Sequence, residues 1–227
     1  MAPKAPAAAE GAGETAEEAS NSFPLRDGWL FRLDPGASMQ PPAIHDKTSP
    51  WEPIQVPHTW QTLKGVPEFS GVAWYRFNLV ALDSWKTVHV RLEFEAVTHT
   101  AHVFLNGELI GQHIGKGYTA FTVDLSPNLH FGEENALFVR VDNRPADRML
   151  PRNRSYDWAD DGGIIRHVNL LITPQVYIER VKIDAVPKLA EAAQRSDCVL
   201  SSGTLHPRRN HSIYTPASGP TKVRVER

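Results

Sequence analysis

The sequence predicts an all-β domain, a sandwich or a barrel, between residues 25 and 186. Segments of about five to ten residues rich in Val, Ile, Phe, Tyr and Trp recur there with turn residues between them, which is typical of such folds. In the segment VHVRLEFEAV, polar side chains alternate with Val88, Val90, Leu92 and Phe94. This period of two indicates a strand with one solvated face and one buried face.

A two-residue turn gives the clearest local prediction. Asn106 and Gly107 stand between the segments AHVFL and ELIGQH. Both central residues of a type I′ turn need positive φ, and Asn-Gly meets that need at little steric cost, so a β-hairpin is expected. No long helix is expected. In chain order, strands are predicted over residues 72–80, 88–97, 101–105, 109–113, 120–125, 136–142, 167–173 and 176–183.

Both ends of the chain differ in composition from this middle part. The first twenty residues are rich in Ala and Glu, and Met1 is their only large apolar side chain. Such a segment cannot bury enough surface to offset its chain entropy, so residues 1–24 are expected to form a disordered leader. Residues 187–227 show no sustained periodicity. We expect an irregular tail there, either the start of a truncated second domain or a frame-shifted sequence.

Composition argues against several classes of function. The 227 residues include 24 Lys+Arg and 26 Asp+Glu, so there is no basic excess to neutralise a nucleic acid. No apolar segment reaches the roughly 18–20 residues that span a bilayer, and no secretory signal is evident, so a cytoplasmic location without membrane contact is expected. Cys198 is the only cysteine, which excludes a multi-cysteine zinc site. The chain is also shorter than a (β/α)₈ barrel of about 250 residues.

The richest cluster of polar and aromatic side chains is RNRSYDWADDGGIIR, at residues 152–166. Carboxylates such as Asp157 and Asp160 can accept hydrogen bonds from vicinal sugar hydroxyls, while Trp158 can cover the apolar face of a sugar. The alternative is a solvated loop whose acids pair with neighbouring arginines, and composition alone favours it. Calcium is a third possibility, although the spacing does not match an EF-hand loop.

Histidine and tryptophan are numerous but do not define a site. Residues three apart in an unbroken strand face opposite sides of a sheet, so His99 and His102 are not expected to share a metal ion. The sequence contains no nucleophile elbow, phosphate loop or dinucleotide fingerprint, so neither a metal nor a cofactor is expected. Three tryptophans near turns or in a strand are expected in the core: Trp51, Trp60 and Trp74.

An ordered series of motifs resembles a known family. The motifs are DGWLFRL, IQVPHTWQ, FSGVAWYR, RLEFEAV, AHVFLNGELIGQHIGKGYTAF, NALFVRVDN and DWADDGGIIRHVNLLITP. Between residue 25 and about residue 186 they closely resemble the N-terminal sugar-binding domain of glycoside hydrolase family 2, the group of β-galactosidases, β-glucuronidases and β-mannosidases. The resemblance implies a jelly-roll sandwich, followed in the family by an immunoglobulin-like domain and a (β/α)₈ barrel.

The resemblance also implies which chemistry to expect. In the family, the barrel carries the two catalytic glutamates of a retaining mechanism. The residues after the matching region contain neither the family's Asn-Glu motif nor room for a barrel. We therefore expect the 227-residue chain to lack hydrolytic activity, to have no catalytic residue of its own, and to have the catalytic barrel of a full-length enzyme as its partner.

One site residue follows from the resemblance. In family enzymes, an aspartate six positions before the Gly of a Gly-Ile-x-Arg motif contacts hydroxyls of the glycosyl unit. Here Gly163 opens that motif, which places the aspartate at Asp157. Trp158 and Asp160 are further candidate substrate contacts. Gly162, Gly163 and Arg166 are expected to shape the loop and to anchor its return strand.

A second family position departs from the pattern. Some β-galactosidases place a sugar-contacting Asn where this chain has Gly71. This difference argues against a specific β-galactosidase assignment. The sequence therefore leaves three functions open: the first domain of a family 2 enzyme that binds a β-glycoside or its terminal sugar weakly, a free-standing carbohydrate-binding module, and an interaction module without sugar contact.

Overall fold

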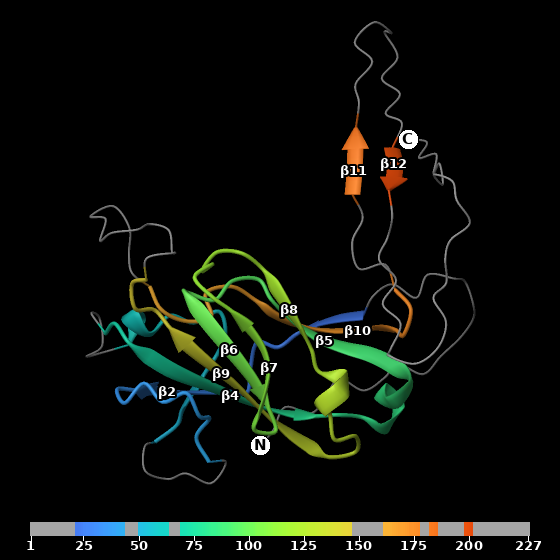
Figure 1. The fold of residues 1–227 in the computed structure, drawn as a ribbon. Coiled ribbons are helices and arrows are strands. Elements are labelled where there is room, and N and C mark those ends of the chain that lie inside the picture. The colour runs from blue at the N-terminus through green and yellow to red at the C-terminus, as the bar shows by residue number, and fades with distance from the viewer. Residues whose placement is uncertain are drawn as a thin grey trace, which may run out of the picture. The chain divides into compact units, whose positions relative to one another are not determined.

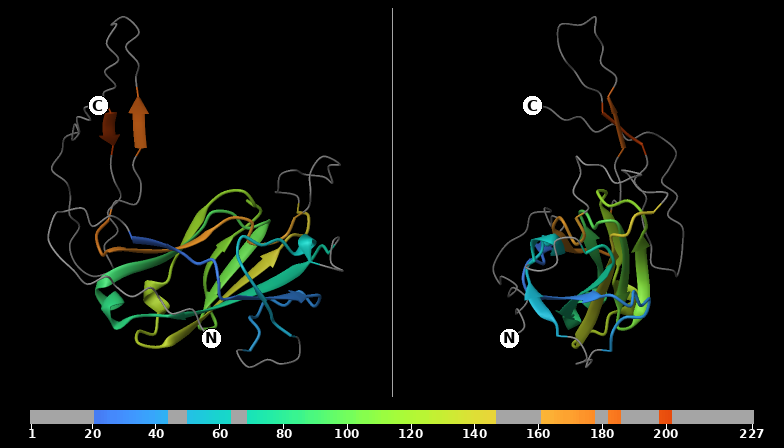
Figure 2. Two further views of the ribbon diagram at one scale, coloured as in Figure 1. Left: turned by 180° about the vertical axis from the view of Figure 1, so that it is seen from behind. Right: turned by 90° about the vertical axis from the view of Figure 1, so that its left-hand side faces the viewer.

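Two antiparallel sheets packed face to face form the main part of the structure (Figure 1; Figure 2). A computed structural model of the chain describes residues 21–43, 50–63, 69–146 and 161–177, and the backbone of residues 182–185 and 198–201. The chain divides into two compact units, residues 1–172 and 173–227. The sandwich belongs to the first unit, and it confirms the predicted all-β fold.

The larger sheet has six strands in the order β3-β2-β4-β9-β6-β7. Neighbouring strands are antiparallel, and the longest pair, β4 with β9, is in register from Val72 opposite Asp142 to Val80 opposite Glu134. The strands are β2 (Trp29–Asp34), β3 (Glu52–Ile54), β4 (Val72–Val80), β6 (Thr100–Leu105), β7 (Glu108–His113) and β9 (Glu134–Asp142).

The smaller sheet has four strands in the order β1-β10-β5-β8. From β4 onward the chain passes between the sheets again and again, because β5, β8 and β10 lie in the smaller sheet and β6, β7 and β9 in the larger. This is the jelly-roll arrangement that the family resemblance implies. The strands are β1 (Asn21–Pro24), β5 (Val88–Phe94), β8 (Phe121–Asp124) and β10 (Val168–Pro174).

Short helices occur only between strands in the described part of the chain. These are the 3₁₀ helices η1 (Trp60–Thr62), η2 (Asp83–Thr87) and η3 (Ser126–Asn128). Among the described residues, no helix has both the length and the apolar character needed to cross a membrane.

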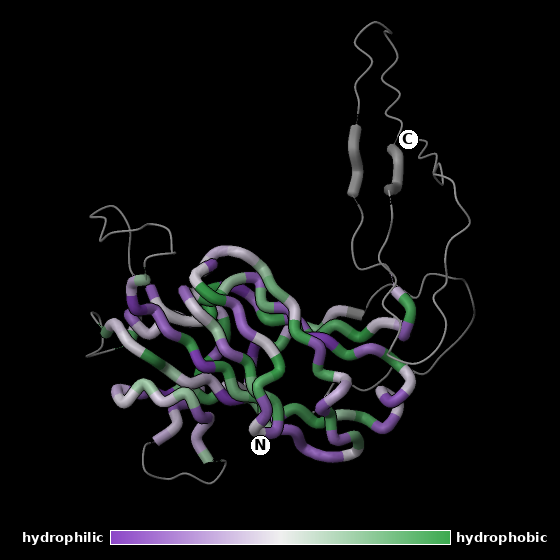
Figure 3. Tube along the Cα trace, in the orientation of Figure 1, coloured by the Kyte–Doolittle hydropathy of each residue, from purple (hydrophilic) through white to green (hydrophobic). Residues whose placement is uncertain are grey.

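The core lies between the sheets, and hydrophobic residues alternate with polar ones along its strands (Figure 3). In β5, Val90, Leu92 and Phe94 are fully buried, as the period of two predicts. β4 departs from that period because both of its faces are covered. Tyr75 points into the core, while Trp74 belongs to a second apolar cluster with Phe104, Ala136 and Phe138.

The predicted hairpin is present between β6 and β7. Asn106 and Gly107 have φ of 52° and 89°, and Leu105 pairs with Glu108. The side chain of Asn106 also reaches other elements. Its Nδ2 donates to the carbonyl of Asn128 (3.0 Å), and its Oδ1 accepts from the backbone N–H of Ala136 (3.0 Å).

Several parts of the predicted organisation differ from the structure, and β2 and β3 were not among the predicted strands. β1 lies inside the segment assigned to the leader, because residues 21–24 pair with β10 and Phe23 packs against the core. The strand expected over residues 176–183 is not observed as such, because residues 176 and 177 are not in a strand. Instead β11 (Lys182–Ala185) pairs with β12 (Cys198–Ser201), so a strand occurs in the segment expected to be irregular. Residues 1–20 and 202–227 lie outside the described residues.

Candidate functional site

The candidate site residues Asp157, Trp158 and Asp160 belong to residues 147–160, which lie outside the described part of the chain. We call residues 147–160 the site loop. The structure does describe the two segments from which this loop departs and to which it returns. Residues 143–146 follow β9, and residues 161–164 precede β10.

The departing end is fixed at Asn143, which is 2% exposed. Its Oδ1 accepts a hydrogen bond from the backbone N–H of Gly71 (2.8 Å), and its own N–H donates to the Gly71 carbonyl (3.1 Å). A side chain at Gly71 would collide with the ring of Phe69, whose Cζ lies 2.6 Å from the position a Cβ would take. Gly71 therefore contributes the backbone groups that hold Asn143, the residue that follows β9.

The charge at this end comes from Asp142. Its Oδ1 accepts from Nε of Arg144 (2.9 Å) and its Oδ2 from Nη2 of Arg144 (2.6 Å), while Nη1 of the buried Arg140 lies 3.5 Å from Oδ2. Burial alone would raise the pKa of Asp142. The hydrogen bonds from Arg144, with the charges of both arginines, outweigh burial and hold that pKa below its usual value.

The returning end lies against the segment after β3. His58 donates its backbone N–H to the carbonyl of Ile164 (2.7 Å). Trp60 donates its backbone N–H to the carbonyl of Gly162 (3.1 Å). The Gln61 side chain completes this contact, because its Oε1 accepts from the N–H of Gly162 (2.8 Å).

The same residues also contact the segment after β5. Thr98 donates its N–H to the carbonyl of Gly163 (2.9 Å), and Ile165 donates to the carbonyl of Ala96 (3.2 Å). Residues 162–165 are thus held between two backbone segments that follow strands of different sheets. Ile164 is fully buried in the core.

The two glycines permit this close approach. A Cβ at Gly162 would overlap the indole ring of Trp60. A Cβ at Gly163 would overlap the carbonyl oxygen of His58 and lie 2.8 Å from the hydroxyl of Tyr75. Gly163 also has a φ of 147°, a conformation that side-chain-bearing residues rarely adopt.

The side chain of Arg166 is exposed, and its anchoring role stays a prediction. The backbone contacts that hold the returning segment come from Gly162, Gly163 and Ile164.

His58 and Tyr75 lie against the returning segment, and neither is among the predicted site residues. Nδ1 of His58 lies 2.8 Å from the hydroxyl of Tyr75. Burial lowers the pKa of His58 from 6.5 to about 4 and raises that of the fully buried Tyr75. The motif IQVPHTWQ contained His58, but nothing in the sequence shows that this residue meets β4.

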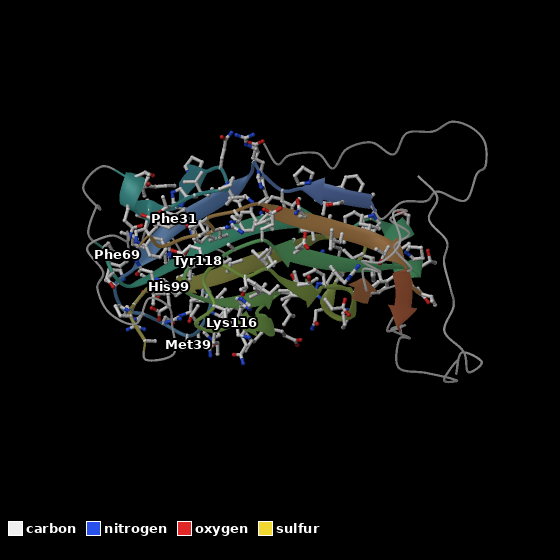
Figure 4. The ribbon with its side chains drawn as sticks, turned by 90° about the horizontal axis from the view of Figure 1, so that it is seen from above. Phe31, Met39, Phe69, His99, Lys116 and Tyr118 are labelled. Atoms are coloured by element: carbon white, nitrogen blue, oxygen red, sulfur yellow. The ribbon has the colours of Figure 1, made fainter. Side chains whose placement is uncertain are left out.

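A second loop borders the same end of the sandwich. Residues 114–120 join β7 to β8, and Gly115 donates its N–H to Oγ1 of Thr100 (3.1 Å). A Cβ at Gly117 would lie 3.0 Å from Nδ1 of His99. Figure 4 shows His99, Tyr118 and Phe69 toward one end of the sandwich.

No metal site is found within the described ranges, which contain no group of three or more His, Cys, Asp or Glu side chains able to hold an ion. His102 lies in β6 opposite Arg140 of β9, and its pKa is lowered by burial and by the charge of Arg140. Trp60 and Trp74 are fully buried, as predicted. Trp51 is half-buried between the ring of Phe138 and the guanidinium of Arg32, which lies 4.9 Å from the indole centroid.

Comparison with known proteins finds matches to one family. The family model described as "Glycosyl hydrolases family 2, sugar binding domain" matches residues 29–174. A beta-glucuronidase of Bacteroides fragilis is 30% identical over 158 residues, covering 68% of this chain and 21% of the relative. A beta-galactosidase of Thermoanaerobacter pseudethanolicus is 33% identical over 138 residues, covering 59% of this chain and 18% of the relative.

A solved structure of a similarly named enzyme shares the fold of this chain. The crystal structure of a Bacteroides uniformis beta-glucuronidase superposes with a TM-score of 0.60 at 28% identity, covering 74% of this chain and 20% of that one. The chain thus spans about a fifth of the length of the proteins it matches.

Proposed function

Since the chain belongs to glycosyl hydrolase family 2, as a sugar-binding domain, we propose that its site loop contacts the terminal sugar of a β-glycoside. Asp157 is the principal contact, because its carboxylate can accept hydrogen bonds from two vicinal hydroxyls. Trp158 covers an apolar face of the sugar ring, and Asp160 supplies a further acceptor. The role of all three is to bind and position the sugar.

The observation that carries this proposal is the fixed attachment of the loop. Asp157 lies six positions before Gly163, which is held between two backbone segments, and Asn143 holds the other end. Because residues 143–146 and 161–164 belong to the same sandwich, we expect the segment between them to present Asp157 at this end of the domain.

For the whole protein, we propose hydrolysis of β-glycosides of the galactoside or glucuronide type, in keeping with the relatives named beta-galactosidase and beta-glucuronidase. Retaining hydrolysis needs two carboxyl groups about 5–5.5 Å apart, one as nucleophile and one as acid and base. We assign no residue of this chain to either role. The chain contributes the positioning of the sugar, and the catalytic barrel of the full-length enzyme completes the site.

Titration of the purified chain with methyl β-D-galactoside and methyl β-D-glucuronide, followed by NMR, tests the proposal. We expect saturable binding in the millimolar range, corresponding to about 4 kcal/mol, to be lost in Asp157→Ala. Asp83→Ala is the matched control, because Asp83 is an exposed acid paired with Lys86 (2.6 Å) in η2. Binding that survives Asp157→Ala, or its absence from the parent chain, would contradict the proposal.

A further inference from the structure

Asn106 and Gly107, the central residues of the turn between β6 and β7, form the only Asn-Gly pair in the sequence. The residue after an asparagine affects its chemical stability, because the backbone nitrogen of that residue can attack the side-chain amide and a side chain there hinders the attack. Gly107 is exposed, and a Cβ added to it would meet nothing within 4 Å. Its N–H forms no hydrogen bond with a described residue. The attacking nitrogen is therefore accessible.

The reaction available to this pair is an intramolecular deamidation, and asparagine is a thermolabile residue. The Gly107 nitrogen loses its proton to water or hydroxide and bonds to Cγ of Asn106. The bond from Cγ to Nδ2 breaks, and Nδ2 leaves as ammonia. Water then opens the cyclic imide at either carbonyl, which gives aspartate or its β-linked isomer. A water molecule is consumed and ammonia is released, without oxidation or reduction.

Three hydrogen bonds of the Asn106 side chain oppose this reaction in the folded chain. Nδ2 donates to the Asn128 carbonyl (3.0 Å) and to Oδ1 of Asn135 (2.8 Å). Oδ1 accepts from the N–H of Ala136 (3.0 Å). The attack makes Cγ tetrahedral and releases Nδ2, so both bonds that Nδ2 donates are lost. The reaction in the folded state therefore requires the turn to open locally.

The product would not fit the contacts that Asn106 makes. A carboxylate only accepts hydrogen bonds. At position 106, one of its oxygens would face two other acceptors, the Asn128 carbonyl and Oδ1 of Asn135. Asn135 is fully buried, and its side chain bonds both the N–H and the carbonyl of His130 (2.8 Å each). The new charge would thus disturb the network that joins the turn to the start of β9.

We propose that Asn106 is a deamidation site that the folded chain protects, and that its conversion weakens the attachment of the β6–β7 hairpin to β9. β7 lies at the end of the larger sheet, with β6 as its neighbour. The hairpin therefore joins the sheet through β6 and through this turn. The inference does not depend on sugar binding.

Peptide mapping by mass spectrometry, after incubation of the full chain at mildly alkaline pH, tests the protection. We expect Asn106 to deamidate at least about tenfold more slowly in the native chain than in the same chain unfolded in urea, the order expected from its hydrogen bonds. If Asn106 stayed intact in urea, it would not be a deamidation site. Equal rates in the native and unfolded chain would show that the fold does not protect it.

Two buried asparagines at opposite ends of β9 separate local opening from global unfolding. Asn135→Ala removes an acceptor of the Asn106 side chain, whereas Asn143→Ala removes the acceptor of the Gly71 N–H at the other end of the strand. We expect Asn135→Ala to accelerate native-state deamidation about tenfold relative to Asn143→Ala. Equal acceleration would mean that global unfolding limits the reaction, which would overturn the proposal.

The urea dependence of the parent chain gives the same answer without a substitution, and it decides the matter where Asn135→Ala does not fold. Below the unfolding transition, a deamidation rate that is independent of urea supports local opening of the turn. A rate that rises in proportion to the unfolded fraction contradicts it.

Asn106→Asp carries the carboxylate of the product and tests its consequence. Asn78→Asp is the matched control, because Asn78 lies in the same sheet and its Oδ1 accepts from Nε of Arg76, a bond that a carboxylate keeps. We expect the unfolding equilibrium constant of Asn106→Asp to exceed that of Asn78→Asp by at least about tenfold in urea denaturation. Equal constants would show that the network tolerates the charge and would overturn the predicted weakening of the hairpin.

Discussion

Asn143 and Gly71 are joined by a reciprocal pair of hydrogen bonds at the point where the site loop leaves the larger sheet. The N–H of Gly71 donates to Oδ1 of Asn143 (2.8 Å), and the N–H of Asn143 donates to the carbonyl of Gly71 (3.1 Å). Because Asn143 is buried, this side chain satisfies a backbone donor that water cannot reach. The end of β9 is thereby fixed to the start of β4.

Substitution of Asn143 tests the importance of this pair. Asn143→Ala leaves the Gly71 N–H buried without an acceptor, which should lower the free energy of unfolding by about 1–3 kcal/mol. Asn78→Ala is the control, because that partly exposed side chain accepts from Nε of Arg76 (3.2 Å) and should cost about 0.5 kcal/mol or less. Urea denaturation measures both. An equal decrease in the free energy of unfolding in both variants would show that the buried Asn143 amide contributes no more than an exposed one.

Substitution of Gly163 tests the close approach beneath the site loop. Gly163→Ala combines an unfavourable φ with a collision against the His58 carbonyl, so we expect a loss of about 3 kcal/mol or more. Gly107→Ala separates the two causes, because Gly107 has a φ of 89° but open space around its Cα. It should cost only about 1–2 kcal/mol. Thermal denaturation compares the two variants. An equal loss of stability would mean that the backbone around Gly163 shifts to accept the added methyl group at no cost.

The fold was largely predictable where local signals agree. Alternation in β5 and the Asn-Gly turn depend on neighbouring residues, and both are found in the structure. β1, β3 and β12 were missed because three or four residues are too few to show a period, and their strand character comes from pairing with other segments. β2 was missed because its sequence WLFRLD does not alternate between polar and apolar residues. In β4, the burial of Trp74 on the outer face obscures the alternation.

The sequence indicated that Gly162 and Gly163 matter, but it did not indicate which residues they pack against. Gly162 and Gly163 signal a turn in the sequence, but the reason for two glycines is the proximity of Trp60 and Tyr75, each about a hundred residues away. His58 was missed for the same cause, since an isolated histidine after a proline carries no local sign of a buried partner. Asp157, Trp158 and Asp160 lie outside the described residues, and their roles stay predictions.

The pH dependence of stability should report on His58. Its pKa is about 4 in the folded chain and near 6.5 when unfolded, so the unfolded state binds more protons between these values. The free energy of unfolding should therefore fall as pH drops from 6.5 toward 4 and be unaffected by His58 above 6.5. His102 and His113 also have lowered pKa values. Urea denaturation at several pH values, with the parent compared to His58→Asn, isolates the contribution of His58. If the free energies of unfolding of the parent and His58→Asn differed by the same amount at every pH, His58 would not be a buried neutral imidazole.

Asp142 and its two arginines predict unequal costs for similar substitutions. Asp142→Asn leaves Arg140, which is 3% exposed, without its counter-charge, and should cost about 3 kcal/mol. Arg144→Ala removes a half-exposed partner that salt already screens, and should cost about 0.5 kcal/mol. Because the folded pKa of Asp142 is lowered, its stabilising effect is present above pH 4 and is lost on further acidification. Urea denaturation at pH 7 and at pH 3.5 measures both effects. If Arg144→Ala were the more damaging change, Arg144 and not the buried Arg140 would be the essential partner of Asp142.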